Sequence, residues 1–325
     1  MARKSKAPAK IQKAQRSLMF RLPDGLSYMD SAEALSKVNR KLFRQGMAYG
    51  IESVDFFFVP QAGVETVRVT AYTAGDTWSV HNSHVKGKAL WNEMNQLVLD
   101  DNPSIAGKWA DYKVFLDVAH RTKFFASGNL DPVDQSLTAY LDGEWTYSQY
   151  VMPQHEVDPA TGIPLAADLT TAHLLGANAG TPGAFNSVGL VEAYEKSRAT
   201  VSANQPNVPA GMSDSFFNLL TDSGSQEPEL ADRIEGENDN APYDLDLYPG
   251  GAGNGSTPVW TEFAVASAGS PNGILGPFVA QCGLVNFSVN GVNAAGEGVA
   301  VANVFARVNF MPGKYKGVAA IPMGQ

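Results

Sequence analysis

The chain has 325 residues, of which 44% are hydrophobic and 18% are charged, and its formal net charge is −9. This length allows one large domain or two small ones, and the composition excludes a globally disordered chain. The single cysteine, Cys282, excludes an internal disulfide. No run of about 20 predominantly apolar residues predicts a transmembrane segment.

The charge is distributed unevenly along the chain. Residues 1–45 carry eleven Lys and Arg against three Asp and Glu, whereas the other 280 residues carry thirteen basic and thirty acidic ones. A basic arm on an acidic body is typical of a tail that binds nucleic acid or a membrane. We predict a flexible arm over residues 1–25, because small residues separate its charges and little apolar surface is available to order it. Within it, residues 11–20 are expected to form a helix only when bound.

Polyanion binding by this arm is the strongest functional signal, since Lys and Arg neutralise phosphates without reading bases. An organelle transit peptide, a membrane-surface patch and a solubility tail are the alternatives. The helix that follows continues the basic surface, although a solvated helix face explains its cations equally well. The candidate nucleic-acid-binding residues are Arg3, Lys4, Lys6, Lys10, Lys13, Arg16, Arg21, Lys37, Arg40, Lys41 and Arg44.

The first elements after the arm follow from residue spacing. Residues 30–47 have apolar side chains at helical intervals behind a capping Asp30 or Ser31. Residues 51–59 and 64–72 are β-branched or alternating and predict a hairpin around an intervening turn. A short strand is expected over residues 76–80 and a second helix over residues 84–99.

The remaining elements are mostly strands. The patterns predict strands over 112–118, 144–152, 169–175, 259–267, 278–289 and 298–311, the last ending at a Pro312-Gly313 turn. Residues 200–257 form a loop-rich acidic excursion that lacks a core of its own. We therefore predict a mainly β fold over residues 26–325. Its expected form is a single jelly-roll antiparallel β-sandwich with helical and loop insertions and a basic N-terminal arm.

No recognised catalytic motif occurs, and no enzymatic activity is predicted. His81 and His84 lack a third ligand for zinc and are expected to be solvated at a strand-to-helix turn. The string Leu219-Leu-Thr-Asp222-Ser-Gly is similar to the motif of aspartic peptidases. Such an enzyme needs two carboxylates that share a proton, so a homodimer would be required. A helix that ends at Thr221 is the structural alternative.

An acidic stretch and the single cysteine are two further features of the sequence. Asp244 and Asp246 lie in an acidic stretch and are weak candidates for Ca²⁺ ligands, although a plain charged loop explains the stretch better. No other cofactor is predicted. Cys282 is expected to be a small buried hydrophobic residue.

Four strings along the chain together resemble a known family. They cover residues 29–49, 111–120, 237–251 and 312–323 and include Ala34-Leu-Ser-Lys-Val-Asn-Arg-Lys-Leu-Phe-Arg-Gln-Gly-Met-Ala-Tyr49 and Pro312-Gly-Lys-Tyr-Lys-Gly-Val-Ala-Ala-Ile-Pro-Met323. The family is the capsid proteins of small circular single-stranded DNA viruses, known mainly from environmental sequencing. None of the four strings is catalytic, so they are diagnostic only in combination.

The resemblance implies a coat protein that self-assembles into an icosahedral shell, with a jelly-roll core and a basic arm inside. The implied partners are other copies of the chain, a single-stranded DNA genome and an unknown host receptor. The implied location is the virion, which is assembled inside the host cell. The segment 263–306 is nearly uncharged, with Glu297 as its single charge. Such a segment fits subunit contacts from which water is excluded. The alternatives are a double jelly-roll capsid protein, a β-rich aspartic peptidase, and a carbohydrate-binding or cell-surface module.

Overall fold

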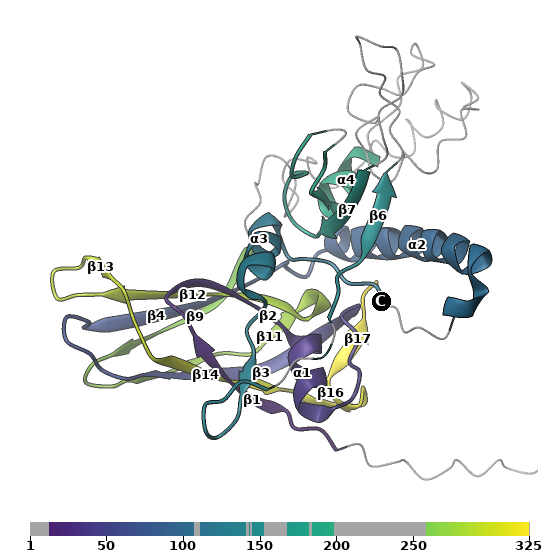
Figure 1. Ribbon diagram of the computed structural model, residues 1–325. Coiled ribbons are helices and arrows are strands. Elements are labelled where there is room, and N and C mark those ends of the chain that lie inside the picture. The colour runs from purple at the N-terminus through teal and green to yellow at the C-terminus, as the bar shows by residue number, and fades with distance from the viewer. Residues whose placement is uncertain are drawn as a thin grey trace, which may run out of the picture.

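The computed structural model describes residues 13–106, 111–140, 143, 145–152, 168–181, 184–197 and 258–324. Within them the protein is mainly β, and two antiparallel sheets pack face to face as a β-sandwich (Figure 1). One sheet contains β1 (Ser17–Leu22), β3 (Met47–Phe58), β5 (Pro132–Val133), β10 (Asn272–Leu275), β11 (Phe278–Ala280), β14 (Val304–Phe310) and β17 (Ala320–Pro322). The other contains β2 (Gly25–Asp30), β4 (Thr66–Thr73), β9 (Val259–Ser267), β12 (Leu284–Val292) and β13 (Gly298–Val299).

Strands that are distant in sequence are neighbours in both sheets. In the first sheet β14 lies between β1 and β3, with Ser17 opposite Asn309 in the β1–β14 pair. β3 also pairs with β10 and β11. In the second sheet β12 pairs with both β2 and β4, and β4 pairs with β9. All of these pairs are antiparallel.

The core lies between the two sheets because alternate residues of each strand point inward. Phe20, Phe56 and Val308 come from the first sheet, and Val69 and Phe287 from the second. None of these five side chains is more than 2% exposed. The larger of the two clusters of buried apolar side chains thus lies between the sheets.

Phe20 provides a direct test of the role of β1. Its side chain is fully buried, and its backbone lies opposite Ala306 of β14. We expect Phe20→Ala to lower the free energy of unfolding by about 3–5 kcal/mol, because the lost apolar contacts leave a cavity. Urea denaturation monitored by circular dichroism measures this change. A loss below about 1 kcal/mol would contradict the placement of β1 in the core.

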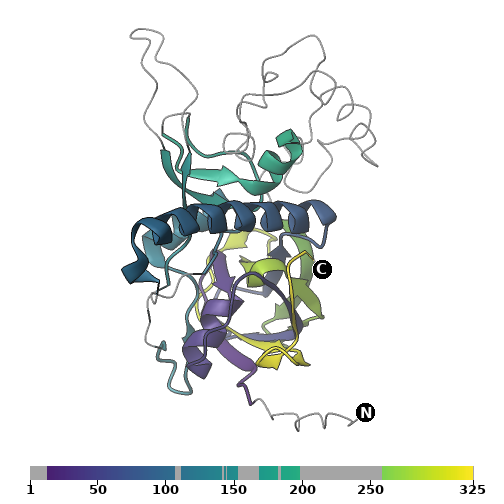
Figure 2. The same ribbon diagram turned by 90° about the vertical axis from the view of Figure 1, so that its right-hand side faces the viewer.

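A long insertion separates β4 from β9. It contains α2 (Trp78–Asp101), η1 (Pro103–Ile105), α3 (Val118–Ser127), a sheet of β6 (Gln149–Met152), β7 (Asp168–His173) and β8 (Ser187–Gly189), and α4 (Leu190–Ser197). Figure 2 shows α2 lying across the molecule between this small sheet and the sandwich. A second buried cluster, which includes Tyr112, Tyr150 and Leu190, fills this region. The excursion expected over residues 200–257 falls within this longer insertion, and those residues lie outside the described ones.

The N-terminal prediction is wrong after residue 16. Residues Ser17–Leu22 form β1 and not a flexible arm or a helix, because Leu18, Phe20 and Leu22 alternate into the core. β2 follows from Gly25. The predicted arm over residues 1–25 therefore includes the whole of one strand of the sandwich. Residues 1–12 lie outside the described part of the chain.

The predicted hairpin is also wrong, although both of its strands exist. β3 and β4 belong to different sheets, so the chain crosses the sandwich between them. The strand expected over residues 76–80 is instead the start of α2, where Thr77 accepts a hydrogen bond from the Val80 N–H. The helix expected over 84–99 is confirmed within α2.

Other predicted elements are confirmed in part. Only Phe115 forms a β-bridge within residues 112–118, because Asp117 caps the unpredicted helix α3. The strand expected over 278–289 is interrupted by η4 (Gln281–Gly283), where Cys282 has a positive φ of 54°. Cys282 is buried, as predicted. Instead of a simple turn, residues Pro312–Gly313 form β15, which pairs with β16 (Gly317–Val318). None of the described helices has the length and hydropathy needed to span a membrane.

Candidate nucleic-acid interface

Helix α1 (Ser31–Asn39) positions the second group of predicted cations. Asp30 caps it, as predicted, and its Oδ1 accepts hydrogen bonds from the Ala32 and Glu33 N–H groups. The helix ends at Asn39 and does not reach residue 47, because Arg40 adopts the left-handed conformation with a φ of 49°. Arg40, Lys41 and Arg44 therefore lie on an exposed loop after the helix.

The segment before β1 is held against the end of α1. The Gln15 N–H donates to Asn39 Oδ1 at 2.7 Å, and Asn39 Nδ2 donates to the Gln15 carbonyl at 3.1 Å. Lys41 Nζ donates to the Lys13 carbonyl at 2.7 Å. These three bonds bring the start of the described chain next to the cations of the α1 loop.

The C-terminal hairpin of β15 and β16 contributes further cations to the same place. The Arg44 N–H donates to the Tyr315 hydroxyl at 3.0 Å, and Lys316 Nζ donates to the Leu42 carbonyl. Burial, together with the positive charges of Arg44 and Lys41, lowers the pKa of Lys316. Arg44 and Lys41 are therefore close enough to Lys316 to disfavour its positive charge, although burial has the larger effect on it.

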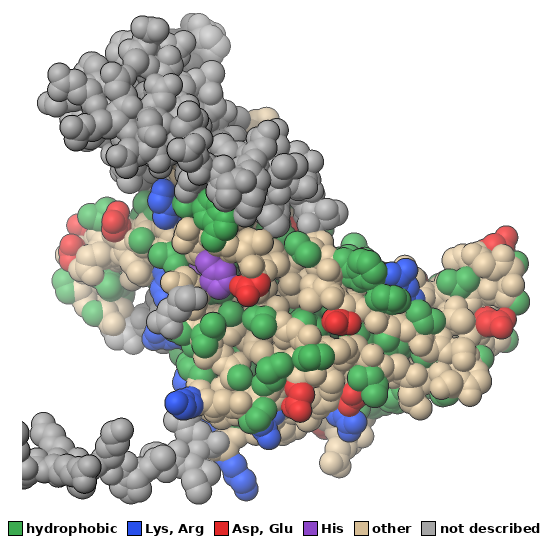
Figure 3. Space-filling model, turned by 180° about the vertical axis from the view of Figure 1, so that it is seen from behind, with side chains coloured by type: hydrophobic (Ala, Val, Ile, Leu, Met, Phe, Trp, Pro, Cys, Tyr) green, Lys and Arg blue, Asp and Glu red, His purple; other side chains and the backbone are tan. Residues whose placement is uncertain are grey.

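We call Lys13, Arg40, Lys41, Arg44, Lys314 and Lys316 the cationic end. It lies where α1 and β16 meet, at the opposite end of the sandwich from β13 (Figure 1). Figure 3 shows several Lys and Arg side chains at the lower left of the body. Among the described residues, none of these six cations forms an ion pair with a carboxylate. Lys and Arg side chains of this kind are the groups that contact phosphates in nucleic-acid-binding proteins.

The structure separates the predicted nucleic-acid-binding residues into groups. Lys13, Arg40, Lys41 and Arg44 meet at the cationic end. The prediction for Lys37 is wrong, because its side chain is only 7% exposed and its ammonium group bonds to Glu33 and Asp131. Arg3, Lys4, Lys6 and Lys10 lie outside the described residues.

Arg16 and Arg21 occupy two other places. Arg16 lines a hollow that Glu52 also lines. Arg21 lies on the outward side of β1 and lines a different pocket. Neither residue is part of the cationic end.

Lys314 and Lys316 are the members of the interface that the sequence prediction missed. They lie in the string Pro312-Gly-Lys-Tyr-Lys, more than 270 positions after Lys41. Two lysines around an aromatic residue in a turn are a weak signal of phosphate binding. Only the fold brings them next to α1.

A buried polar network joins α1 to α3 beside this interface. Asp30 Oδ2 accepts hydrogen bonds from Gln45 Nε2 and Trp145 Nε1, at 2.9 and 3.2 Å. Asn129 Nδ2 donates to Glu33 Oε2 at 2.7 Å, and its Oδ1 lies 2.7 Å from His120 Nε2. Burial, with the neighbouring Glu33 charge, raises the pKa of Asp30, and burial lowers the pKa of His120 to about 4. The network connects the sandwich to its insertion.

Asp117 makes the stability of this region depend on pH. Burial raises the pKa of Asp117 to about 6, so between pH 4 and 6 the folded state binds the proton more tightly than the unfolded state. The stability contributed by this group therefore falls as pH rises through that window. We expect Asp117→Asn, which keeps a capping oxygen, to gain up to about 3 kcal/mol relative to wild type between pH 4 and 7. Thermal melts of both proteins across this range measure the gain. A constant difference between them would contradict the raised pKa.

His81 and His84 lie in the described part of the chain, whereas the candidate aspartates for calcium binding and peptidase activity do not. His81 and His84 both lie within α2 and not at a turn, and His84 is buried with neither ring nitrogen hydrogen-bonded. Among the described residues, no group of three or more His, Cys, Asp or Glu side chains is arranged to hold a metal ion. Asp222, Asp244 and Asp246 lie outside the described residues.

Comparisons with known proteins do not identify a family for this chain. No protein-family model matches the chain, and no curated protein and no solved structure is similar to it at a significant level.

Proposed function

We propose that this chain is a coat protein that assembles into a closed icosahedral shell and packages single-stranded DNA through its basic N-terminal segment and the cationic end. The protein acts as a structural component of a virion and not as an enzyme. Its partners are other copies of itself and the enclosed nucleic acid. Three features of the molecule support this proposal.

The nested pairing of eight strands is the observation that carries the proposal. In chain order the principal strands of the sandwich are β1, β2, β3, β4, β9, β10, β12 and β14, with β11 extending the β10 edge. The first pairs with the last, the second with the seventh, the third with the sixth, and the fourth with the fifth. A long antiparallel hairpin rolled into two sheets has this pairing, and it is the pattern of a jelly roll. Jelly rolls form viral capsid domains, although lectins and cupins also use them.

The cationic end favours a capsid protein over these other jelly-roll proteins, because fold alone does not determine function. It combines cations from the segment before β1, the α1 loop and the β15–β16 hairpin on a protein whose net charge is −9. Such a concentration suits phosphate binding without sequence preference. The four strings that resemble coat proteins agree with this assignment.

An exposed apolar strip on β9 supports self-assembly. Trp260 is 55% exposed, Phe263 44% and Val265 52%, and all three lie on one strand at the edge of its sheet. Ile274 of β10 and Val279 of β11, which belong to the other sheet, are also exposed. Figure 3 shows hydrophobic side chains gathered on this side of the sandwich. Contiguous exposed apolar residues of this kind mark protein–protein contacts.

The packaging role predicts a strong dependence of DNA binding on salt. We expect the full-length protein to bind single-stranded DNA of different sequences with equal affinity. The slope of log affinity against log salt should be at least as steep as about −3, because residues 1–12 alone supply four cations at roughly −0.7 per contact. Fluorescence anisotropy with labelled oligonucleotides measures both quantities. The absence of binding at 50 mM salt would contradict the packaging role.

A further inference from the structure

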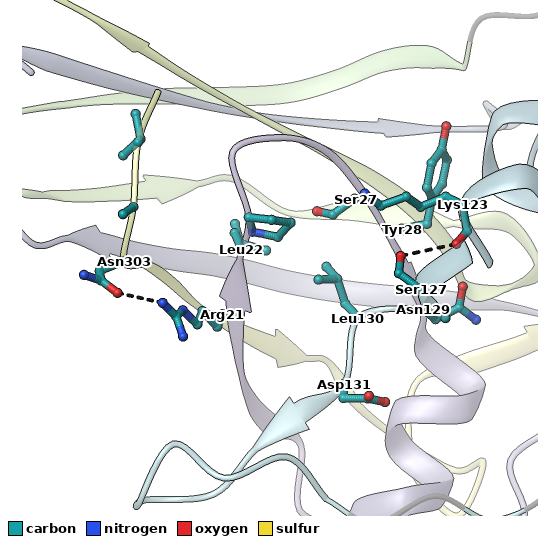
Figure 4. A pocket seen from close by; sticks show the side chains of 14 residues that line it. Arg21, Leu22, Ser27, Tyr28, Lys123, Ser127, Asn129, Leu130, Asp131 and Asn303 are labelled. Carbon is teal, nitrogen blue, oxygen red and sulfur yellow. Dashed lines mark hydrogen bonds between the residues drawn. The ribbon is translucent and has the colours of Figure 1, made fainter. Parts of the chain in front are cut away.

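A second cationic feature lies on the sandwich away from the cationic end. A pocket of about 520 Å³ opens between the β1–β2 turn, the end of α3 and residues 301–303. Figure 4 shows its two cations, Arg21 and Lys123, on opposite sides, with Leu130 between them. The exposed Pro23 ring also lines the pocket. The pocket thus has an apolar centre and a cation at each side.

Arg21 is oriented at the pocket by a single hydrogen bond. Its Nη2 donates to Asn303 Oδ1 at 2.9 Å, and no carboxylate among the described residues forms an ion pair with it. A guanidinium has five N–H donors, so most of the donors of Arg21 remain available to a ligand. The strand β1 fixes this orientation because its inward neighbours, Phe20 and Leu22, are buried.

Lys123 is exposed on α3 and has no described ion-pair partner. Ser127, one turn later, also lines the pocket, and its hydroxyl donates to the Lys123 carbonyl at 3.3 Å. Among the described residues, Asp131 is the one carboxylate that lines the pocket, and the Lys37 ammonium group binds it. The ligand therefore meets two free cations, and the nearby carboxylate is already paired.

We propose that this pocket binds a short stretch of single-stranded nucleic acid, with backbone phosphates on Arg21 and Lys123 and a sugar or base over Pro23 and Leu130. Two separated cations suit two phosphates of one strand better than they suit a single small anion. Arg21 is four residues from Ser17, which is about 13 Å along a strand. A nucleic acid held at the cationic end can thus continue along β1 to the pocket. This inference rests on the proposed packaging function.

The test compares four full-length proteins: wild type, Arg21→Gln/Lys123→Gln, Lys123→Gln, and the control Lys86→Gln. Lys86 is an exposed helical lysine on α2, away from the pocket. The probe is a single-stranded oligonucleotide that contains 5-iodouracil, used for anisotropy titrations in salt and for photocrosslinking with peptide mapping. We expect the salt slope to become less steep by about 1.4 in the double variant and about 0.7 in Lys123→Gln, and to be unchanged in Lys86→Gln. Crosslinks to residues 22–28 and 127–131 should appear in wild type and disappear in the double variant.

The outcomes separate this inference from the proposed function. If wild type binds the oligonucleotide but the double variant keeps the wild-type slope and no crosslink maps to the pocket, the pocket inference is wrong and the packaging function stands. If wild type does not bind the oligonucleotide, both proposals are wrong. If the Lys86→Gln slope falls as much as the Lys123→Gln slope, the effect is general charge loss and the pocket inference is wrong. Melting curves for each variant show that it is folded.

Discussion

Replacing Trp260 and Phe263 with serine is expected to leave the protein folded but unable to form shells. Both side chains lie on the exposed side of β9, so their loss removes little from the core between the sheets. In an assembled shell they would instead be buried against a neighbouring copy. Truncation of a hot-spot residue at a protein interface costs about 2 kcal/mol or more, and such residues are enriched in Trp, Tyr and Arg. Light scattering of the variant should report monomers or small oligomers under conditions in which wild type forms particles.

The physical reason is the character of the strip around these two residues. Their rings lie 5.2 Å apart, and the Arg68 guanidinium lies 4.7 Å from the Phe263 ring centre and 5.8 Å from that of Trp260. An arginine over aromatic rings at an exposed surface contributes about 0.5–1 kcal/mol, and more when a partner excludes water. The strip therefore combines an apolar surface, formed by the two rings, with a polar group beside it, the Arg68 guanidinium. Subunit contacts have this combination of an apolar centre and a polar rim.

Leu97→Ser is the matched control. Leu97 is 67% exposed on α2, so this variant also removes an exposed apolar side chain, but from the insertion. Shells formed by the Trp260→Ser/Phe263→Ser protein at the wild-type yield would show that β9 is not a subunit contact. Loss of shells in both variants would indicate a general effect of surface hydrophobicity.

Deleting residues 1–12 is expected to give shells that contain much less nucleic acid. The deletion removes Arg3, Lys4, Lys6 and Lys10 and leaves the described body intact. It must stop before Ser17, because β1 contributes Leu18, Phe20 and Leu22 to the core and pairs with β14. The ratio of absorbance at 260 and 280 nm in purified particles should fall. In binding assays the salt slope should become less steep by about 3, since four phosphate contacts are lost.

A charge-neutral arm separates the effect of charge from that of length. We expect the variant with glutamine at all four positions to behave like the deletion. An unchanged absorbance ratio in both variants would show that residues 1–12 do not package nucleic acid and would leave that role to the cationic end.

Local sequence patterns predicted individual elements better than their partners. The alternation over residues 51–59 and 64–72 correctly indicated β3 and β4. The short connection favours a hairpin, but local alternation does not reveal which sheet receives the next strand. In a sandwich with nested pairing, consecutive strands cross between sheets, so each partner lies far away in sequence.

The sequence patterns did not predict β1 or α3. Leu18, Phe20 and Leu22 alternate at period two, but the surrounding cations made the whole segment look disordered. The apolar run over residues 112–118 favoured a strand, and the cap at Asp117 that starts α3 was missed.

The candidate interface was predictable only in part. The cations after α1 were found because they are close together in sequence. Lys37 is buried because it pairs with Asp131, which is distant in sequence. The hairpin that carries Lys314 and Lys316 lies next to the α1 loop because Lys316 bonds to the distant Leu42. Such contacts follow from the tertiary fold and leave no local pattern.

Negative-stain electron microscopy of the purified full-length protein, combined with light scattering across salt and protein concentration, tests the central claim most directly. If the chain is a coat protein, we expect closed particles of uniform diameter that contain nucleic acid. Monomers and dimers under all conditions would contradict the claim.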